Sequence, residues 1–248
     1  MSELLQLNNV TKSFGAVEAL VNVSFTVNSG EVVALLGDNG AGKSTLIKIL
    51  SGVHKHDNGK IKWQGNDIVI KSPAHARQIG FSVVYQDLAV VPLISIYRNF
   101  FLGKEELICK KILGVSFIRN NYAKNIARNA LKQLGIEIEN VESNVGVLSG
   151  GERQSISIAR AVYFQSKLLI LDEPTAALSL KETAKVLSYV QEAKKSDVGV
   201  IMITHNISHA WDSADRFVVL YRGEVASILR KDETSVKEIE NLINTGKK

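Results

Sequence analysis

Hydrophobic and polar residues form short strand-like runs at the start of the chain. Runs 4–10 and 21–27 lie on either side of Gly15 and are rich in Leu and Val, so we predict two antiparallel edge strands. Run 31–36 differs, because its apolar residues follow one another directly, as in a strand buried on both faces. A glycine-rich turn and a helical pattern follow, which predicts a strand–loop–helix unit. The apolar face of this helix is predicted at Leu46, Ile49, Leu50 and Val53.

The pattern changes in the middle of the chain. Residues 61–70, interrupted by Gly65-Asn66-Asp67, predict a hairpin, and Ser72 followed by Pro73 is typical of the start of a helix. Residues 81–85 predict a further strand. From 87 to about 147 the strand pattern disappears and apolar residues recur at helical spacing, so we predict a helical insertion. The recurring positions are Ile126, Ala127, Ala130, Leu131 and Leu134.

Alternation of strands and helices returns after Lys167. Three apolar runs, 168–171, 198–204 and 216–220, have the length of buried strands. Two helices are expected where a Ser is followed three residues later by a Glu, the pattern of a capping box. These pairs are Ser179 with Glu182 and Ser235 with Glu238.

Together these elements predict an α/β fold with a mainly parallel sheet, an antiparallel β subdomain and a helical subdomain. All 248 residues are expected to form a single domain. The core and the antiparallel β subdomain are assigned to residues 1–86 and 165–248, and the helical subdomain to residues 87–164.

Composition narrows the class of protein without naming an activity. Hydrophobic residues at 45% and charged residues at 22% are close to globular averages, which excludes disordered and collagen-like chains. The net charge of +5 comes from scattered Lys and Arg and favours a solvated surface over a nucleic-acid partner. Cys109 is the only cysteine, which excludes an intrachain disulfide and fits a reducing compartment. Without a signal sequence or an apolar run of roughly 18 to 20 residues, we expect a cytoplasmic protein that reaches a membrane through a partner.

The first candidate site is the glycine-rich turn after residues 31–36. Residues 37–44 fit the pattern G-x-x-x-x-G-K-[ST], between a predicted strand and a predicted helix. Glycines let backbone N–H groups turn toward phosphates, and the helix N-terminus adds partial positive charge. Lys43 is expected to neutralise the β- and γ-phosphates, and Ser44 to bind Mg²⁺. The candidate residues are Gly37, Asp38, Asn39, Gly40, Ala41, Gly42, Lys43 and Ser44.

Two carboxylates end the apolar run 168–171. Asp172 and Glu173 are expected at the carboxyl edge of the sheet, where ligands bind in open α/β folds. Asp172 is suited to hold Mg²⁺, and Glu173 to orient or deprotonate the attacking water. The alternative is an acidic turn that ends the strand before Pro174.

Residues 148–152 form a second candidate anion site. Leu148-Ser149-Gly150-Gly151-Glu152 places glycines and a hydroxyl at a predicted helix start, where free N–H donors meet a positive helix end. An ordinary Ser-Gly-Gly loop before a helix fits the local sequence equally well. One nucleotide needs only one phosphate loop, so a second such helix end suggests that it completes the nucleotide site of another copy.

This set of motifs resembles the ATP-binding subunits of ABC transporters, and the resemblance covers nearly the whole chain. Residues 37–45, ending in Thr45, together with Tyr85-Gln86-Asp87-Leu88 and residues 173–178, look most like importers of simple sugars. The resemblance implies a P-loop NTPase core, ATP and Mg²⁺ as cofactors, and hydrolysis of ATP. It further implies that Phe14 stacks on adenine, that Gln86 senses Mg²⁺ and the γ-phosphate, and that His205 contacts the γ-phosphate.

Alternatives remain for several of these residues. Phe14 also fits a core aromatic, and Gln86 by itself says little. His205 with His209 and His54 with His56 have spacings that suit metal pairs, but no third ligand is near in sequence, so polar-surface or phosphate-contact roles are favoured. Two positions depart from the common family pattern, Ser179 in place of Asp and Glu152 in place of Gln.

The family resemblance also implies partners. A head-to-tail dimer, or a pair with a second ATPase, would sandwich two nucleotides between phosphate loops and signature helices. Closure of this dimer would be transmitted to a membrane permease through residues 87–103. The alternative for these residues is ordinary packing within the subdomain. An external solute-binding protein would deliver the solute. Other ABC transporters and, less so, non-transport ABC ATPases remain open, as does a kinase or GTPase that would leave residues 148–152 unexplained. No nucleic-acid partner is expected.

Overall fold

The computed structural model describes residues 2–86, 90–112, 115–133, 135–176 and 178–247. Its strands are β1 (Glu3–Phe14), β2 (Val17–Asn28), β3 (Val32–Leu36), β4 (Asn58–Trp63), β5 (Asn66–Ile68), β6 (Phe81–Val84), β7 (Cys109–Ile112), β8 (Val115–Ile118), β9 (Leu168–Asp172), β10 (Gly199–Ile203), β11 (Arg216–Tyr221) and β12 (Glu224–Arg230). Its α-helices are α1 (Lys43–Leu50), α2 (Pro73–Gln78), α3 (Ile96–Phe100), α4 (Asn120–Gln133), α5 (Gly150–Tyr163), α6 (Leu180–Lys195), α7 (Ile207–Ser213) and α8 (Val236–Thr245). Short 3₁₀ turns span Glu105–Leu107, Val145–Val147 and Lys231–Glu233.

A six-stranded sheet forms the centre of the molecule, in the order β12-β11-β3-β10-β9-β6. Strands β11, β3, β10, β9 and β6 are parallel, and β12 is antiparallel at one edge. All five residues of β3 are buried, as expected for a central strand with both faces covered. The prediction of a mainly parallel sheet is confirmed.

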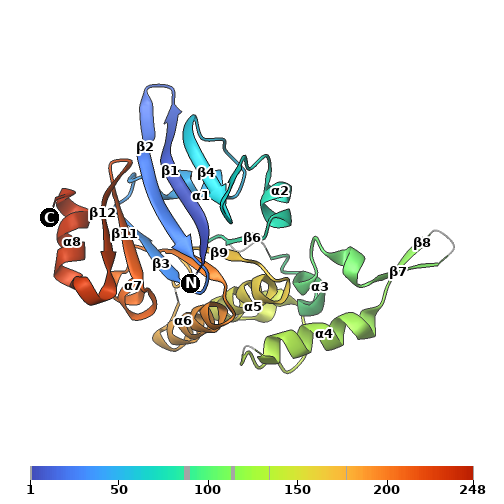
Figure 1. Cartoon of the computed structure of the whole chain (residues 1–248). Helices are drawn as coiled ribbons and strands as arrows, with labels where there is room; N and C mark the ends of the chain where they lie inside the picture. The colour runs from blue at the N-terminus through green and yellow to red at the C-terminus, as the bar shows by residue number, and fades with distance from the viewer. Residues whose placement is uncertain (1, 87–89, 113–114, 134, 177, 248) are drawn as a thin grey trace.

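The central sheet has a different neighbour on each face. Alternate residues of β3 enter two separate cores, Val33 and Leu35 in one and Val32, Ala34 and Leu36 in the other. The first core also holds the antiparallel sheet β2-β1-β4-β5 and α1. The second continues through α4, α5 and α6, so the helical region shares one core with the sheet (Figure 1). The division at residues 87–164 remains a prediction.

Two expectations about single elements are wrong. The first strand is not at an edge of its sheet, because β1 pairs with β2 on one side and with β4 on the other. Val53 is not on the buried face of α1, since the helix ends at Leu50, Gly52 takes a left-handed φ of 76°, and Val53 is 50% exposed. Leu134, Ala177 and 87–89 lie outside the described residues.

The region 87–147 is not free of strands. Strands β7 and β8 form an antiparallel hairpin that projects from the helical region (Figure 1). Each has only four residues, and the described side chains of β8 are exposed on both faces, so no alternation of buried and polar positions marks them in the sequence. Among the described residues no helix combines the length and hydrophobicity that a membrane crossing requires.

Candidate functional site

The loop after β3 is held tightly at its two ends. A Cβ at Gly37 would lie 2.4 Å from the carbonyl oxygen of Leu220 on β11, and one at Gly42 would lie 2.6 Å from that of Ala19 on β2. Both glycines also have positive φ, 151° and 103°. The sequence therefore needs glycine where the loop touches its neighbours, while residues 38–40 between them are exposed.

Lys43 begins α1 and bends back over this loop. Its Nζ donates to the carbonyl oxygens of Gly37 at 2.7 Å and Asp38 at 2.9 Å. Burial lowers the pKa of Lys43, while the negative charges of Glu173, Asp38 and Asp172 act in the opposite direction. The N-cap Gly42 offers no side-chain hydrogen bond to the first turn. The helix end therefore keeps backbone donors and a cation for an anionic ligand.

Parallel register brings the other predicted residues to the same edge of the sheet. Ile203 at the end of β10 lies opposite Leu35 of β3 and Asp172 of β9. Because all three strands run the same way, the residues that follow them emerge together. The phosphate loop, Asp172 with Glu173, and His205 are therefore neighbours, as the sequence predicted for the sheet edge.

Glu173 and His205 form a contact beside the loop. Glu173 Oε2 lies 3.0 Å from His205 Nδ1, and the carboxylate side chain is only 14% exposed while the imidazole is 75% exposed. Glu173 has a left-handed φ of 48°, and its N–H donates to the carbonyl oxygen of Ile203 at 2.9 Å. Such a conformation is unfavourable for a non-glycine residue and is common at functional sites. The backbone thus aims a shielded carboxylate toward an exposed histidine.

The surroundings of the Asp172 carboxylate favour a bound cation. Burial raises its pKa, Glu173 raises it further, and Lys43 acts against this increase. Two acids in a half-buried position beside the first turn of α1 are suited to a hard divalent cation, which prefers oxygen ligands. The Asp172 carboxylate and the Ser44 hydroxyl therefore fit Mg²⁺. Among the described residues no group of three His, Cys, Asp or Glu side chains gathers into a metal site.

Gln86 follows β6 and is exposed. It lines a pocket of about 300 Å³ together with Glu173 and Gly150 at the start of α5. Arg153 and Gln154 line the same pocket, and Arg153 Nε and Gln154 Nε2 have no hydrogen-bond partner among the described residues. Neither was predicted as a site residue. Their only sequence signal is their place directly after Glu152.

Phe14 ends β1 opposite Val17, across the hairpin turn. It is 44% exposed, so the alternative of a core aromatic does not hold. His54 meets its ring edge-on at 5.2 Å, and Lys12 Nζ lies 5.3 Å from the ring centroid. Ala19 lies two residues beyond Val17 on β2, and its carbonyl oxygen approaches the phosphate loop at Gly42. The ring is thus available for stacking on the side of the loop.

Residues 148–152 begin α5 as predicted, and Ser149 is its N-cap. Ser149 Oγ accepts from the N–H of Glu152 at 3.3 Å, and a Glu152 carboxylate oxygen accepts from the N–H of Ser149 at 2.8 Å. The N–H of Gly151 donates to Glu182 on α6 at 3.4 Å. Several first-turn donors of α5 therefore already have carboxylate or hydroxyl partners.

Glu182 joins this helix start to that of α6. Its carboxylate accepts from Ser179 N–H at 3.0 Å and Ser179 Oγ at 2.8 Å. Hydrogen bonds from the Ser149 side chain and from Ser179 lower its pKa from 4.5 to about 2. The capping box at Ser179 is predicted by sequence; the contact with Gly151 is not, because it joins residues 31 positions apart. His209, the other half of the His205 pair, contacts Thr175 Oγ1 at 2.9 Å.

The loop, its lysine and the nearby carboxylates at one edge of a parallel sheet define a P-loop nucleotide-binding protein. The chain belongs to the ABC transporter family, whose sequence profile matches residues 20–176. This confirms the resemblance predicted from the motifs.

Two similar relatives match almost end to end. The xylose/arabinose import ATP-binding protein of Sulfolobus acidocaldarius is 47% identical, over 99% of this chain and 95% of the relative. The fructose import ATP-binding protein of Rhizobium meliloti is 40% identical, over 93% and 90%. A ribose import ATP-binding protein of Geobacillus kaustophilus is 38% identical over 97% of this chain, which spans about half (48%) of that relative.

Solved structures agree with the fold. An ADP-bound ATP-binding cassette of an ABC transporter superposes with a TM-score of 0.81 at 27% identity, over 99% of this chain and 96% of the other. A dimeric bacterial ABC transporter cassette gives a TM-score of 0.76 at 25% identity, over 92% and 99%. The predicted ABC ATPase fold is confirmed.

Proposed function

We propose that this chain hydrolyses ATP to energise an ABC importer of a monosaccharide. The observation that carries the proposal is an open phosphate loop with two adjacent carboxylates, together with the sequence Leu148-Ser149-Gly150-Gly151-Glu152, the family's signature sequence, at the start of α5. Family membership and the names of the xylose/arabinose and fructose import relatives support the choice of an importer of simple sugars.

The residues at the sheet edge divide the chemistry among them. Lys43 and the N–H groups of residues 38–44 bind the β- and γ-phosphates, and the Phe14 ring stacks on the adenine. Ser44 and Asp172, with Gln86, would hold Mg²⁺, which supplies charge neutralisation between the phosphates when it is bound. Glu173 orients and polarises the attacking water, and His205 contacts the γ-phosphate from its exposed position.

A second chain completes each site in the proposed mechanism. The α5 start at Leu148, Ser149, Gly150, Gly151 and Glu152 faces the nucleotide of a partner, which is another copy or a separate ATPase. ATP closes the pair and hydrolysis reopens it. The dimeric relative supports this arrangement.

A groove between α2, β6 and α5 is the proposed site for a membrane permease. It has a volume of about 430 Å³ and is lined by Arg77, Phe81, Lys104 and Arg160 among others. Arg160 donates to the carbonyl oxygen of Leu102 at 2.7 Å, but its Nε has no partner among the described residues, and burial lowers its pKa. A half-buried guanidinium of this kind suits an acidic side chain of a docked segment. The chain would then lie on the cytoplasmic face of the membrane, with an external solute-binding protein acting only through the permease.

Uptake by the host tests both parts of the proposal. We expect deletion of the gene to abolish uptake of at least one labelled monosaccharide among xylose, arabinose, fructose and ribose, and the native gene to restore it. Glu173→Gln should bind ATP yet fail to restore uptake, because its turnover falls by about 10²–10⁴-fold when the polarising carboxylate is lost. Glu192→Gln on the outer surface of α6 is the matched control and should restore uptake.

The outcomes separate the two claims. ATP turnover that survives Glu173→Gln would contradict the assigned chemistry. Loss of amino-acid or lipid transport with unchanged uptake of every sugar would leave an ABC ATPase but overturn the sugar assignment.

A further inference from the structure

The hairpin β7–β8 stands apart from both cores. Its two strands form a separate two-stranded sheet, and Figure 1 shows it projecting beyond α3 and α4. An isolated two-stranded hairpin is marginally stable in water unless it packs against something else. A projecting hairpin therefore calls for a partner surface.

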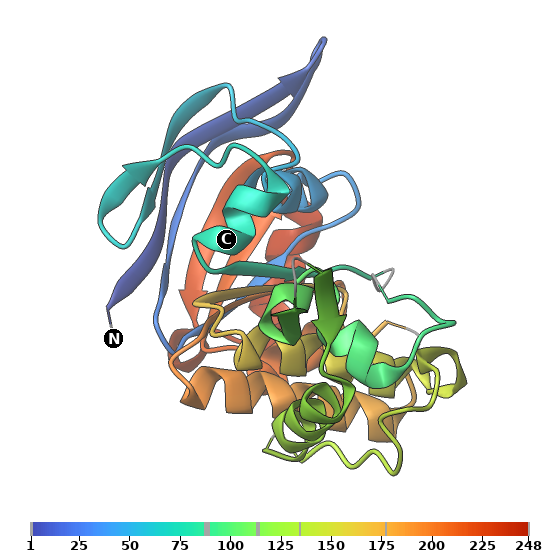
Figure 2. The same ribbon diagram turned by 90° about the vertical axis from the view of Figure 1, so that its right-hand side faces the viewer.

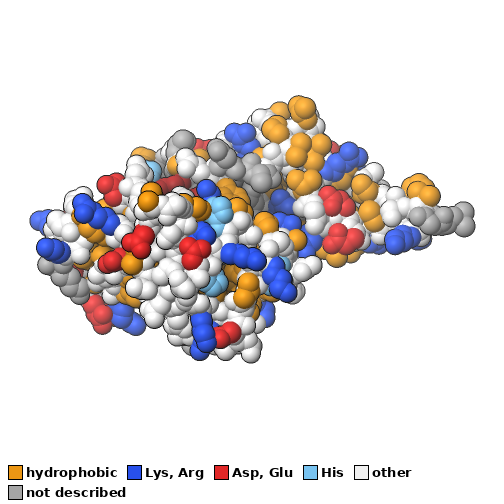
Figure 3. Space-filling view, turned by 90° about the horizontal axis from the view of Figure 1, so that it is seen from above, with side chains coloured by type: hydrophobic (Ala, Val, Ile, Leu, Met, Phe, Trp, Pro, Cys, Tyr) orange, Lys and Arg blue, Asp and Glu red, His pale blue; other side chains and the backbone are white. Residues whose placement is uncertain are grey.

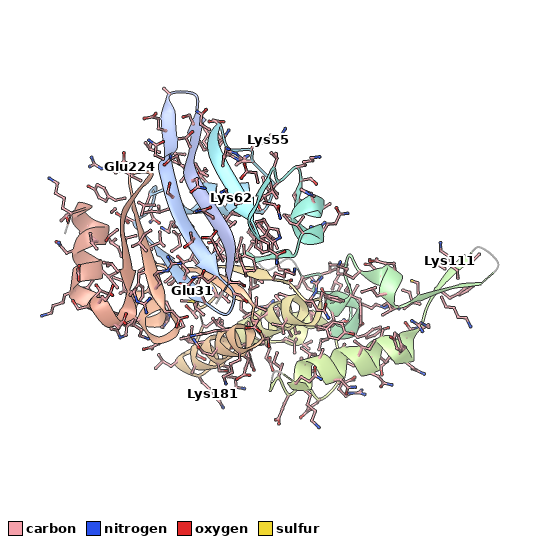
Figure 4. All side chains as sticks on the ribbon, viewed as in Figure 1. Glu31, Lys55, Lys62, Lys111, Lys181 and Glu224 are labelled. Carbon is pink, nitrogen blue, oxygen red and sulfur yellow. The ribbon has the colours of Figure 1, made fainter. Side chains whose placement is uncertain are left out.

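The exposed side chains of this hairpin are apolar and cationic. Val115, Phe117 and Ile118 are 56%, 53% and 42% exposed. Phe117 lies opposite Lys110 and Ile118 opposite Cys109, so apolar groups occupy both faces of the ribbon. We call the set Lys110, Lys111, Val115, Phe117, Ile118 and Arg119 the basic arm; Figure 3 shows its mixture of hydrophobic and basic side chains, and Figure 4 labels Lys111 on it.

The positive charge of the arm is not neutralised locally. Residues 107–136 contain six basic residues and no Asp or Glu, although an average stretch of this chain that long would hold about three acids. The acids that flank this stretch are Glu105 and Glu106 before it and Glu137 and Glu139 after it, and Lys124 of α4 pairs with Glu142. Among the described residues no ion pair involves Lys110, Lys111 or Arg119. The six basic residues are Lys110, Lys111, Arg119, Lys124, Arg128 and Lys132.

Arg119 and Tyr122 fix the foot of the arm. The Arg119 guanidinium lies 4.1 Å from the centroid of the Tyr122 ring and donates to the carbonyl oxygen of Leu107 at 3.3 Å. Its N–H donates to the carbonyl oxygen of Ile108 at 2.8 Å. The arm is thus anchored to α4 while its cationic and apolar end points outward.

The arm lies close in sequence to the groove assigned above to the permease. Leu102, Gly103 and Lys104 line that groove, and the arm starts five residues later at Cys109. In Figure 1 the helices α2 and α3 and the hairpin β7–β8 lie toward the same side of the molecule, and Figure 2 views that side directly. A membrane that holds the permease would therefore face the arm.

We propose that the basic arm rests on anionic lipid headgroups at the membrane surface beside the permease. Lys110 and Lys111 would pair with headgroup phosphates, while Val115, Phe117 and Ile118 enter the boundary between headgroups and acyl chains. Lipid is favoured over an acidic protein loop because apolar side chains protrude on both faces of a thin ribbon, which a fluid interface can surround. It is favoured over nucleic acid because only Phe117 among the exposed hairpin residues offers a stacking ring.

The experiment uses the purified chain and vesicles without any permease. We expect it to sediment with phosphatidylcholine vesicles that contain phosphatidylglycerol, to bind pure phosphatidylcholine vesicles far more weakly, and to release as salt rises. Lys110→Glu with Lys111→Glu should weaken binding by at least about 25-fold, because each basic residue near an anionic surface contributes roughly fivefold. Phe117→Ser should weaken it roughly tenfold through lost apolar burial.

The control is a second pair of charge reversals far from the arm. Lys62→Glu with Lys237→Glu changes the net charge equally, at β4 and α8, and should leave vesicle binding within about twofold of native. ATP hydrolysis and thermal unfolding of the arm variants should match native, because these residues lie outside both cores.

The lipid contact rests on the proposed function only for the orientation of the arm toward a membrane. Its failure can be distinguished from a failure of the proposed function. Equal binding to neutral and anionic vesicles, unchanged binding of the arm variants, or tighter binding to poly(U) than to vesicles would overturn it. Arm variants that bind vesicles normally but no longer assemble with the permease would assign the arm to a protein partner instead. Vesicle binding that persists while the chain fails to join any permease would overturn the proposed function alone.

Discussion

The starts of α1 and α5 carry similar sequence signals but have different electrostatic states. At α1 no side chain caps the first turn, and Lys43 adds positive charge beside the open N–H groups. At α5 the Ser149–Glu152 capping box and Glu182 already accept hydrogen bonds from N–H groups at the helix start. The carboxylates of Glu152 and Glu182 therefore lie where an anion would bind. One helix end is ready for phosphate, and the other is satisfied within the chain.

This difference indicates a division of labour between the two helix ends. In the proposed mechanism the loop before α1 would bind nucleotide in the single folded chain, because its glycines fix the backbone before any ligand arrives. The start of α5 would bind phosphate only by exchanging its internal carboxylate contacts for those of the ligand. A weak affinity of α5 for phosphate in the single chain would keep the proposed dimer dependent on ATP.

Mixing two inactive variants tests the comparison with the largest expected effect. Lys43→Ala disables the α1 end and Ser149→Arg disables the α5 end, and each alone should lower ATP turnover by about 10²–10³-fold. Mixed chains should regain measurable turnover, because some pairs then join an intact α1 end to an intact α5 end. Steady-state hydrolysis of each variant and of the mixture is the measurement.

Folding must be checked in the same samples. Ser149→Arg also removes an N-cap, which costs about 1 kcal/mol, so its thermal unfolding is compared with that of Ser149→Ala. A mixture no more active than the better single variant, with both chains folded, would contradict a site shared between copies.

Removing a single charge at α5 should sharpen the contrast. Glu152→Gln keeps the capping box, which accepts Gln at this position, but removes negative charge from the helix end. We expect ATP-dependent dimers in a Glu173→Gln background to tighten by roughly fivefold, the effect of ~1 kcal/mol of relieved repulsion at an exposed site. Sedimentation equilibrium measures the association, and Glu137→Gln, on the exposed loop after α4, is the control. An unchanged association constant would mean that Glu152 does not oppose the phosphate.

The sequence predicted those parts of the fold in which successive residues of a strand are all buried. Continuous apolar runs in the sequence predicted the strands β3, β9, β10 and β11, because both faces of a parallel sheet are covered. The hairpin β7–β8 was missed for the opposite reason, since neither face is buried. The basic residues of 107–136 looked scattered because no two but Lys110 and Lys111 are adjacent, and folding places three of them on one arm.

The sequence predicted those site residues that lie together in one short segment. The phosphate loop and Asp172-Glu173 each follow a strand, so sheet register alone brings them together. Contacts such as Gly151 with Glu182 depend on how α5 packs against α6, and nothing in either segment records it. The left-handed backbone of Glu173 was equally hidden, because local sequence favours the opposite sign of φ for Glu.

The smallest effect in the comparison concerns Glu182, the carboxylate shared by the starts of α5 and α6. Its pKa falls from 4.5 to about 2 on folding, through hydrogen bonds from Ser149, Ser179 and Gly151. A lowered folded pKa means that the ionised carboxylate stabilises the fold above pH 4.5, and that this stabilisation is lost as the pH falls from 4.5 toward about 2. Glu182→Gln should therefore unfold at a lower temperature than native at neutral pH, with the difference narrowing steadily below pH 4.5. Glu192→Gln on the same helix, whose native side chain pairs with Lys195 on the surface, should show a smaller difference at every pH. Thermal unfolding across this pH range is the measurement, and a Glu182→Gln deficit that stays constant as the pH falls would show that the carboxylate does not hold the two helix starts together through its charge.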